Sequence, residues 1–281
     1  QGAMSNRTAR GGFDAVCKTA VGFDDGQQAF VGAMWFQPQS GRARQPDLFV
    51  GAEGLGKETL ARAFAMTLQC LHPDPASRPC GECSACHRIL SESYPDVMYS
   101  VRETATLKID EIRRISAQIA MKPFEGRRRI AIFRDFDTAM GVGQDALLKT
   151  LEEPAETGVL ILLARSLAPI LATITSRSQV FRLRPVSIVT IRDALIARGT
   201  DEKTAAILAA LSGGRPGWAL NALADSAVLD MRSAALDMLE NLVKDTRAKR
   251  FAAAEDLAKD KDALRTLLEL WLSYWRDLVL I

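Results

Sequence analysis

Short apolar runs alternate with helical patterns between residues 46 and 185. Four of these runs have the length of buried strands, and the segments between them place apolar residues at helical spacing. Strands that alternate with helices are typical of a parallel sheet covered by helices on both faces. The sequence therefore predicts an α/β domain with strands at Leu48–Val50, Ile130–Phe133, Val159–Leu163 and Val180–Leu183, and helices at Glu58–Leu71 and Gly143–Leu151.

After the last of these strands the pattern becomes helical. Residues 186–226 contain two or three short helices separated by Gly and Pro, and residues 227–281 contain long amphipathic ones. We expect these two helical domains to follow an α/β domain at residues 1–185, although residues 1–45 themselves fit no clear pattern. The chain remains apolar up to Ile281, so we expect the natural sequence to continue beyond it.

Composition and charge narrow the classes of function. Of the 281 residues, 48% are hydrophobic and 25% charged, which is typical of a globular chain with a sizeable core. A net charge of only +2 gives no electrostatic reason for tight nucleic-acid binding by the chain alone. No apolar run is long enough to span a membrane or to form a signal peptide, so we expect a cytoplasmic protein without a membrane partner.

Four of the five cysteines lie close together with the spacing C-x9-C-x2-C-x2-C. In a reducing compartment such a cluster indicates a metal site rather than disulfides. Four thiolates can enclose Zn²⁺ tetrahedrally and leave no position open for water. The sequence therefore predicts a structural zinc site formed by Cys70, Cys80, Cys83 and Cys86, whereas Cys17 is expected to be an ordinary small residue.

A glycine-rich loop follows the first predicted strand and opens a helix. Its glycines would let backbone N–H groups close on phosphates, and its lysine would meet the terminal phosphates. The helix N-terminus adds a partial positive charge. The pattern predicts a nucleotide site formed by Gly51, Gly54, Gly56, Lys57 and Thr59.

Two positions of this site that should bind Mg²⁺ are altered. The residue after Lys57 should carry a hydroxyl but is Glu58, and Thr59 comes one position late, which turns it by about 100° on a helix. The acidic pair expected after the second strand reads Arg134-Asp135. We expect a P-loop that keeps its shape without hydrolysing ATP, so the chain by itself would not be an ATPase; binding of ATP without hydrolysis remains open.

Three segments resemble signatures of the bacterial clamp-loader AAA+ family. Asp145–Pro154 is similar to the family's "ALLKTLEEP", Thr173–Gln179 to its "T-I-x-S-R-C-Q" and Tyr94–Val97 to its "HPDV". The order and flanking strands agree over residues 46–225. The resemblance implies an α/β P-loop (AAA+) parallel-sheet domain with a zinc module inserted at about residues 66–95, then a small helical lid and a helical collar, which we expect to be incomplete here.

Within this family the altered ATP site resembles the delta-prime type of subunit. The resemblance implies a non-motor stator subunit of DNA polymerase III, a nucleotidyltransferase that acts in DNA replication. The implied partners are other clamp-loader subunits (the gamma/tau motor and delta), the sliding clamp and, through the complex, primer-template DNA. It also implies that Arg177 is an arginine finger, which stabilises charge on the ATP held by a neighbouring subunit.

Two other functions compete with this interpretation. The first is a gamma/tau-like motor that binds and hydrolyses ATP itself, which Glu58 and Arg134 disfavour. The second is a separate module that binds zinc and nucleic acid. The near-neutral charge and the lack of interleaved aromatic residues disfavour that module.

Overall fold

The computed structural model describes residues 45–224 and 227–279, and the structural statements below concern these residues. The expectations for Cys17, for residues 1–44 and for the chain end at Ile281 lie outside them. The chain divides into two compact units, one ending at Trp218 and the other beginning at Ala219. The division into an AAA+ domain, a lid and a collar stays a prediction. None of the described helices is long and apolar enough to cross a membrane.

Five parallel strands form one sheet in the first unit, in the order β2-β3-β4-β1-β5. The four predicted strands are confirmed, each shifted by no more than one residue at either end. The short strand β2 was not predicted. The strands are β1 (Asp47–Val50), β2 (Val97–Tyr99), β3 (Arg129–Phe133), β4 (Gly158–Ala164) and β5 (Gln179–Arg182).

Helices connect the strands and dominate the described chain after β5. Those of the α/β part are α3 (Lys57–Gln69), α4 (Ser84–Leu90), α5 (Ile109–Ile119), α6 (Gly141–Glu152) and α7 (Ala172–Thr175), with short 3-10 turns η1 (Pro75–Ser77) and η2 (Phe136–Thr138). Later helices are α8 (Ile188–Ile196), α9 (Glu202–Leu211), α10 (Pro216–Ala224), α11 (Ala227–Lys244), α12 (Arg247–Leu257) and α13 (Lys261–Val279).

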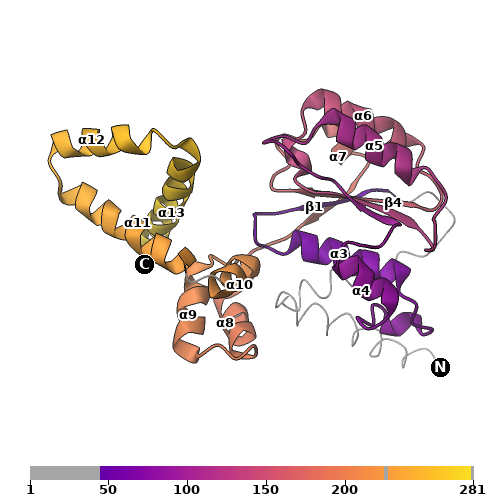
Figure 1. Ribbon diagram of the computed structural model, residues 1–281, viewed down its shortest axis with the longest axis horizontal. Coiled ribbons are helices and arrows are strands. Elements are labelled where there is room, and N and C mark those ends of the chain that lie inside the picture. Colours follow the sequence, from indigo (N-terminus) through magenta and orange to yellow (C-terminus); the bar gives the residue numbers. More distant parts are fainter. Residues whose placement is uncertain (1–44, 225–226, 280–281) are drawn as a thin grey trace. The chain divides into compact units, whose positions relative to one another are not determined.

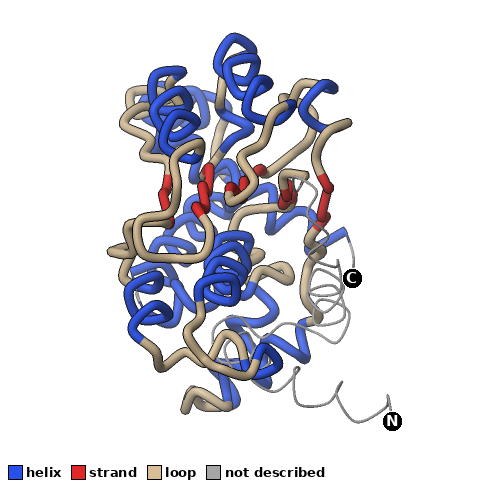
Figure 2. The backbone as a smooth tube through the Cα atoms, turned by 90° about the vertical axis from the view of Figure 1, so that its right-hand side faces the viewer, coloured by secondary structure: helices blue, strands red, loops and turns tan. Residues whose placement is uncertain are grey.

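Each strand divides its side chains between two hydrophobic cores, because successive residues point to opposite faces of a sheet. Phe49 and Ile161 pack with α3 and α4, whereas Leu48 and Leu162 pack with α5 and α6. Figure 1 shows these helices in two layers, and Figure 2 shows strands between helices. Burial on both faces explains why β4 is apolar along its whole length.

The later helices follow from local signals that the sequence contains. Ser187 accepts a hydrogen bond from the backbone N–H of Thr190 at the start of α8, and Asp201 does the same for Thr204 at the start of α9. In the second unit, the indole N–H of Trp271 in α13 donates to the carbonyl of Ala235 in α11 at 2.8 Å. The predicted helical character of both segments is therefore confirmed.

The topology places the P-loop at a distinct point of the sheet. The chain passes from β1 to the far strand β2, returns through β3 and β4, and then adds β5 on the other side of β1. In open parallel sheets, ligands bind outside the carboxyl ends of the strands where the strand order reverses. The loops after β1, β3 and β4 begin at this edge.

Candidate functional site

The loop between β1 and α3 has a conformation that depends on glycine. Gly54 and Gly56 have φ angles of 79° and 86°, in the left-handed region that side chains with a Cβ atom rarely adopt. The N–H of Gly51 donates to the carbonyl of Ala164 at 3.1 Å, which fixes the loop to the end of β4. The predicted nucleotide-binding residues lie in this loop and the first turn of α3: Gly51, Gly54, Gly56, Lys57 and Thr59.

The side chain of Lys57 folds onto its own loop. Its Nζ donates to the carbonyl oxygens of Gly51 at 2.6 Å and Ala52 at 2.9 Å. Burial lowers the pKa of Lys57, although Asp137 and Asp135 oppose this effect. Protein carbonyls therefore accept two of the three protons with which the ammonium could bind phosphate.

Glu58 and Arg134, the two residues that depart from the ATP-site pattern, pair with each other. Nη2 of Arg134 lies 2.6 Å from Oε1 of Glu58. Arg62 also pairs with Glu58, and Glu92 pairs with Arg134 and, at 3.3 Å, with Arg62. The guanidinium of Arg134 lies 4.6 Å from the ring centre of Tyr99. We call Glu58, Arg62, Glu92 and Arg134 the charge cluster.

The charge cluster neutralises itself. Burial opposes ionisation, yet hydrogen bonds and charge from Arg62 and Arg134 lower the pKa of Glu58. Burial also opposes the charge of Arg134, but Glu92 and Glu58 raise the pKa of its guanidinium. The four side chains are 28–38% exposed, so each pair contributes about 1 kcal/mol at most.

This arrangement changes what the site can do chemically. ATP hydrolysis in P-loop enzymes uses a hydroxyl after the lysine and a carboxylate after the next strand to hold Mg²⁺. Here a guanidinium stands at the carboxylate position and cannot ligate a cation. The carboxylate of Glu58 is turned toward two arginines instead of being free for a metal.

The sequence identified Glu58 and Arg134 separately but did not show that they are partners. It also missed Arg62 and Glu92. Arg62 could have been found, because it lies four residues after Glu58 on the same helix face. Glu92 gave no sequence signal, because its approach depends on how α4 packs against α3.

The other acidic residues after β3 are also engaged by arginines. Asp135 has a φ of 46° and lies 3.5 Å from Arg102. Asp137 lies 3.4 Å from Arg165, the residue that follows β4. Asp135, the acidic residue that remains of the expected acidic pair, is therefore held in an ion pair within this chain.

The first turn of α10 rests on the tip of the P-loop. The N–H of Gly217 donates to the carbonyl of Gly54 at 2.8 Å. A Cβ atom on Gly217 would lie only 3.0 Å from that carbonyl oxygen. Two glycines are therefore needed for the backbones to approach this closely.

Arg177 lies just after α7. Its Nη2 is 3.1 Å from Oε1 of Glu152 at the end of α6, and its Nη1 donates to the carbonyl of Thr173 at 3.2 Å. The side chain is 43% exposed. Within the described residues these partners come from α6 and α7 and do not join Arg177 to the P-loop.

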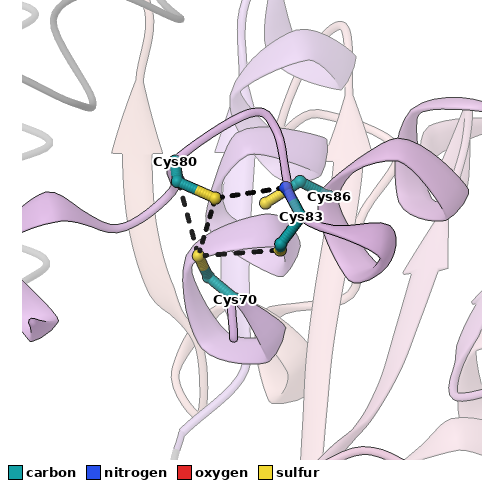
Figure 3. Close-up of side chains that lie close together, drawn as sticks. All are labelled: Cys70, Cys80, Cys83 and Cys86. Carbon is teal, nitrogen blue, oxygen red and sulfur yellow. Dashed lines mark hydrogen bonds between the residues drawn. The ribbon is translucent and has the colours of Figure 1, made fainter. Parts of the chain in front are cut away.

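The four clustered cysteines converge on one point (Figure 3). Their sulfur atoms all lie within 4.8 Å of one another, with the sulfurs of Cys70 and Cys80 3.6 Å apart and those of Cys70 and Cys83 4.0 Å apart. Sulfurs around one Zn²⁺ at ~2.3 Å lie roughly 3.8 Å from each other, whereas a disulfide requires ~2.05 Å. All four are free thiols. The predicted site residues are therefore brought together in a geometry that fits a metal ion.

The surroundings of the sulfurs also suit thiolate ligands. The N–H of Cys80 points to Sγ of Cys70 at 3.4 Å, and the N–H of Cys83 to Sγ of Cys80 at 3.3 Å. Burial raises the pKa of Cys70 and Cys86. Burial alone would also raise the pKa of Cys83, but hydrogen bonds from the backbone of Leu71 and Cys86 lower it to about 6. A cluster of this kind can hold a soft or borderline cation.

Comparison with known proteins identifies the family of this chain. Residues 26–187 match the family described as DNA polymerase III, delta subunit. The chain belongs to this family. The clamp-loader resemblance of the sequence motifs is thereby confirmed.

Relatives of two subunit types match the chain. It is 31% identical to the delta' subunit of DNA polymerase III from Pseudomonas aeruginosa over 219 residues, which are 75% of this chain and 66% of that protein. It is also 31% identical to the tau/gamma subunit from Haemophilus influenzae over 159 residues, 57% of this chain and 23% of that protein. A gamma subunit-related protein from Thermotoga maritima aligns with a TM-score of 0.45 at 19% identity, over 81% of this chain and 76% of that one.

These matches establish the family but not the type of subunit. The chain spans 66% and 23% of the two curated relatives, less than two thirds of each. Because both delta' and tau/gamma proteins match, the choice between them depends on the residues of the site.

Proposed function

We propose that this chain is a non-motor, delta-prime-type subunit of the DNA polymerase III clamp loader. It supports the loading of sliding clamps during DNA replication and leaves ATP hydrolysis to a neighbouring subunit. The charge cluster carries this proposal. Its Glu58–Arg134 ion pair, with the two atoms 2.6 Å apart, takes the place of two Mg²⁺-binding positions.

The proposed contribution to catalysis in trans comes from Arg177. Its ion pair with Glu152 joins two side chains that are 43% and 54% exposed, so it is weak and exchangeable. A phosphate forms the same charge-assisted, often bidentate hydrogen bonds with a guanidinium as a carboxylate does, so it can compete for Arg177. Glu152 would therefore hold Arg177 in place until the ATP of the adjacent subunit replaces it.

The remaining roles of the chain are structural. We assign the four cysteines to a Zn²⁺ ion, which would link the end of α3 to α4 and leave no ligand position for water. Residues 186–226 would form the lid and residues 227–281 a collar for assembly with gamma/tau and delta subunits. Contact with primer-template DNA would come through the complex.

The test uses Mg²⁺-ATP with the purified full chain and with charge-reversed variants. We expect no turnover by the unmodified chain, and none by Glu58→Thr or Arg134→Asp alone, because each restores only one of the two Mg²⁺-binding positions. The double variant Glu58→Thr/Arg134→Asp restores a hydroxyl and a carboxylate, so we expect Mg²⁺-dependent ATP binding that Lys57→Ala abolishes. Calorimetry and phosphate release measure both effects.

The second candidate, a gamma/tau-like motor ATPase, is favoured by the glycines and lysine of the P-loop and by the tau/gamma relative. Clear ATP turnover by the unmodified chain, abolished by Lys57→Ala, would establish this motor and exclude the non-motor role.

A further inference from the structure

Loop 121–128 joins α5 to β3 and is anchored by a fully buried carboxylate. Asp96, directly before β2, has no exposed surface. It accepts the N–H groups of Phe124–Gly126 at distances of 2.7–2.9 Å. These contacts give the Tyr94–Val97 motif a physical reason to contain an aspartate.

Gln69 anchors the same loop from a second side. It is the last residue of α3, is 2% exposed, and directly precedes Cys70. Its Oε1 accepts the N–H of Arg127 at 2.9 Å, and its Nε2 donates to the carbonyl of Arg128. A Cβ atom on Gly126 would lie 2.6 Å from the Gln69 side chain, so a larger residue there would displace that side chain from the loop.

A third support comes from α4. Nη1 of Arg88 lies 2.6 Å from Oε1 of Glu125, and its guanidinium lies 5.1 Å from the ring centre of Tyr94. Arg88 follows Cys86 by two residues. Tyr94 is buried in the same hydrophobic core as Cys70 and Cys86. Two of the three supports therefore belong to helical segments that carry cysteines of the four-cysteine site.

The loop presents apolar side chains on this fixed backbone. Phe124 is 79% exposed, the most exposed large apolar side chain in the described part of the chain, and Met121 is 56% exposed. A buried carboxylate and a buried amide are costly unless their hydrogen bonds are made. Because Asp96 and Gln69 both hold this one surface loop, we infer that a fixed loop conformation is important to the protein.

We propose that the four-cysteine module is a brace for loop 121–128. A metal ion bound by the four sulfurs fixes the end of α3 and the start of α4, and through Gln69 and Arg88 it fixes the backbone that presents Phe124. Without the metal, the supports from Gln69 and Arg88 loosen, and Asp96 remains as the buried anchor of the loop. This coupling requires metal binding at the cysteines and is independent of the proposed role in clamp loading.

Amide hydrogen exchange of the full chain tests the brace, with Zn²⁺ bound and after removal by a chelator. We expect the amides of residues 124–127 to exchange about tenfold faster without metal, while those of β4 stay protected. Trypsin cleavage after Arg127 and Arg128 should rise in parallel. If the amides of residues 124–127 exchange at the same rate with and without Zn²⁺, the proposal is wrong. This holds both when the chelator removes bound metal and when the chain never binds it.

Two variants separate the brace from general unfolding. Gln69→Ala and Arg88→Ala keep all four cysteines, so both should retain zinc by metal analysis while the loop amides exchange faster. Arg113→Ala, at an exposed arginine of α5, is the control and should change neither quantity. If the metal-free chain unfolds throughout, the Gln69→Ala variant provides the test instead. The proposal is wrong if this variant binds a full equivalent of zinc and its loop amides exchange as slowly as in the unmodified chain.

Discussion

At the scale of single residues, the chain replaces ligand-binding chemistry with internal pairing. Glu58 and Arg134 each look like a damaged ATP-site residue, but together they form an ion pair with Arg62 and Glu92 as further members. Asp96 shows the same use of a charged group inside the protein. Its carboxylate accepts three backbone N–H groups and lies 3.5 Å from Nε of Arg129, so it is engaged within the protein.

The buried state of Asp96 predicts a defined dependence of stability on pH. Burial would raise its pKa, but the three N–H groups lower it below the ordinary 3.8. A carboxyl group whose pKa is lower in the folded state stabilises the fold above its unfolded pKa. That stabilisation is lost as the pH falls below about 4 toward the folded value.

We expect Asp96→Asn to lower the free energy of unfolding at pH 7 by about 2–4 kcal/mol. The amide NH₂ group of Asn cannot accept a hydrogen bond, so at least one of the backbone N–H donors would lose its acceptor. Urea denaturation at pH 7 and at pH 3–4 measures this loss. The difference between the two proteins should shrink in acid. An equal difference at both pH values would show that the charge of Asp96 does not stabilise the fold.

At the scale of elements, the sheet and the P-loop follow from local sequence. Continuous apolar runs fit strands covered on both faces, and glycine permits the left-handed turn that starts α3. The cysteine spacing also acts at this scale, because it brings the end of α3, a loop and α4 to one point.

Glycine at the start of α3 is expected to be required. Gly56 has a φ of 86°, so Gly56→Ala should destabilise the protein by about 1–2 kcal/mol through backbone strain. A Cβ atom on Gly141, at the start of α6, would meet only open space, and the φ of Gly141 is not in the left-handed region. Gly141→Ala is therefore the matched control and should be neutral or slightly stabilising. Urea denaturation followed by circular dichroism compares them; equal losses would contradict the strain argument.

At the scale of the whole molecule, family membership and the altered site together favour a subunit that works through its neighbours. The chain retains the P-loop shape, but its charges are balanced internally. The exposed guanidinium of Arg177, held by Glu152, is the group we propose to reach another subunit.

We expect Arg177→Ala to reduce the ATPase rate of a clamp loader reconstituted with gamma/tau and delta subunits by about 10-fold or more. The reason is that a finger arginine stabilises negative charge in the transition state. Subunit assembly, followed by gel filtration, should be unchanged. Glu152→Ala serves as a comparison and should have a smaller effect. A rate equal to that of the unmodified complex would rule out the finger role.

The sequence alone determined the features that depend on neighbouring residues: four strands, the P-loop, the helical segments and the cysteine spacing. The tertiary structure decided which distant charges meet. Arg134 and Glu58 are 76 positions apart and become partners because the sheet places the end of β3 near the start of α3. Asp96 and loop 121–128 likewise meet only through packing. Periodicity encodes which residues are buried, but it does not encode which charged side chains face one another across elements.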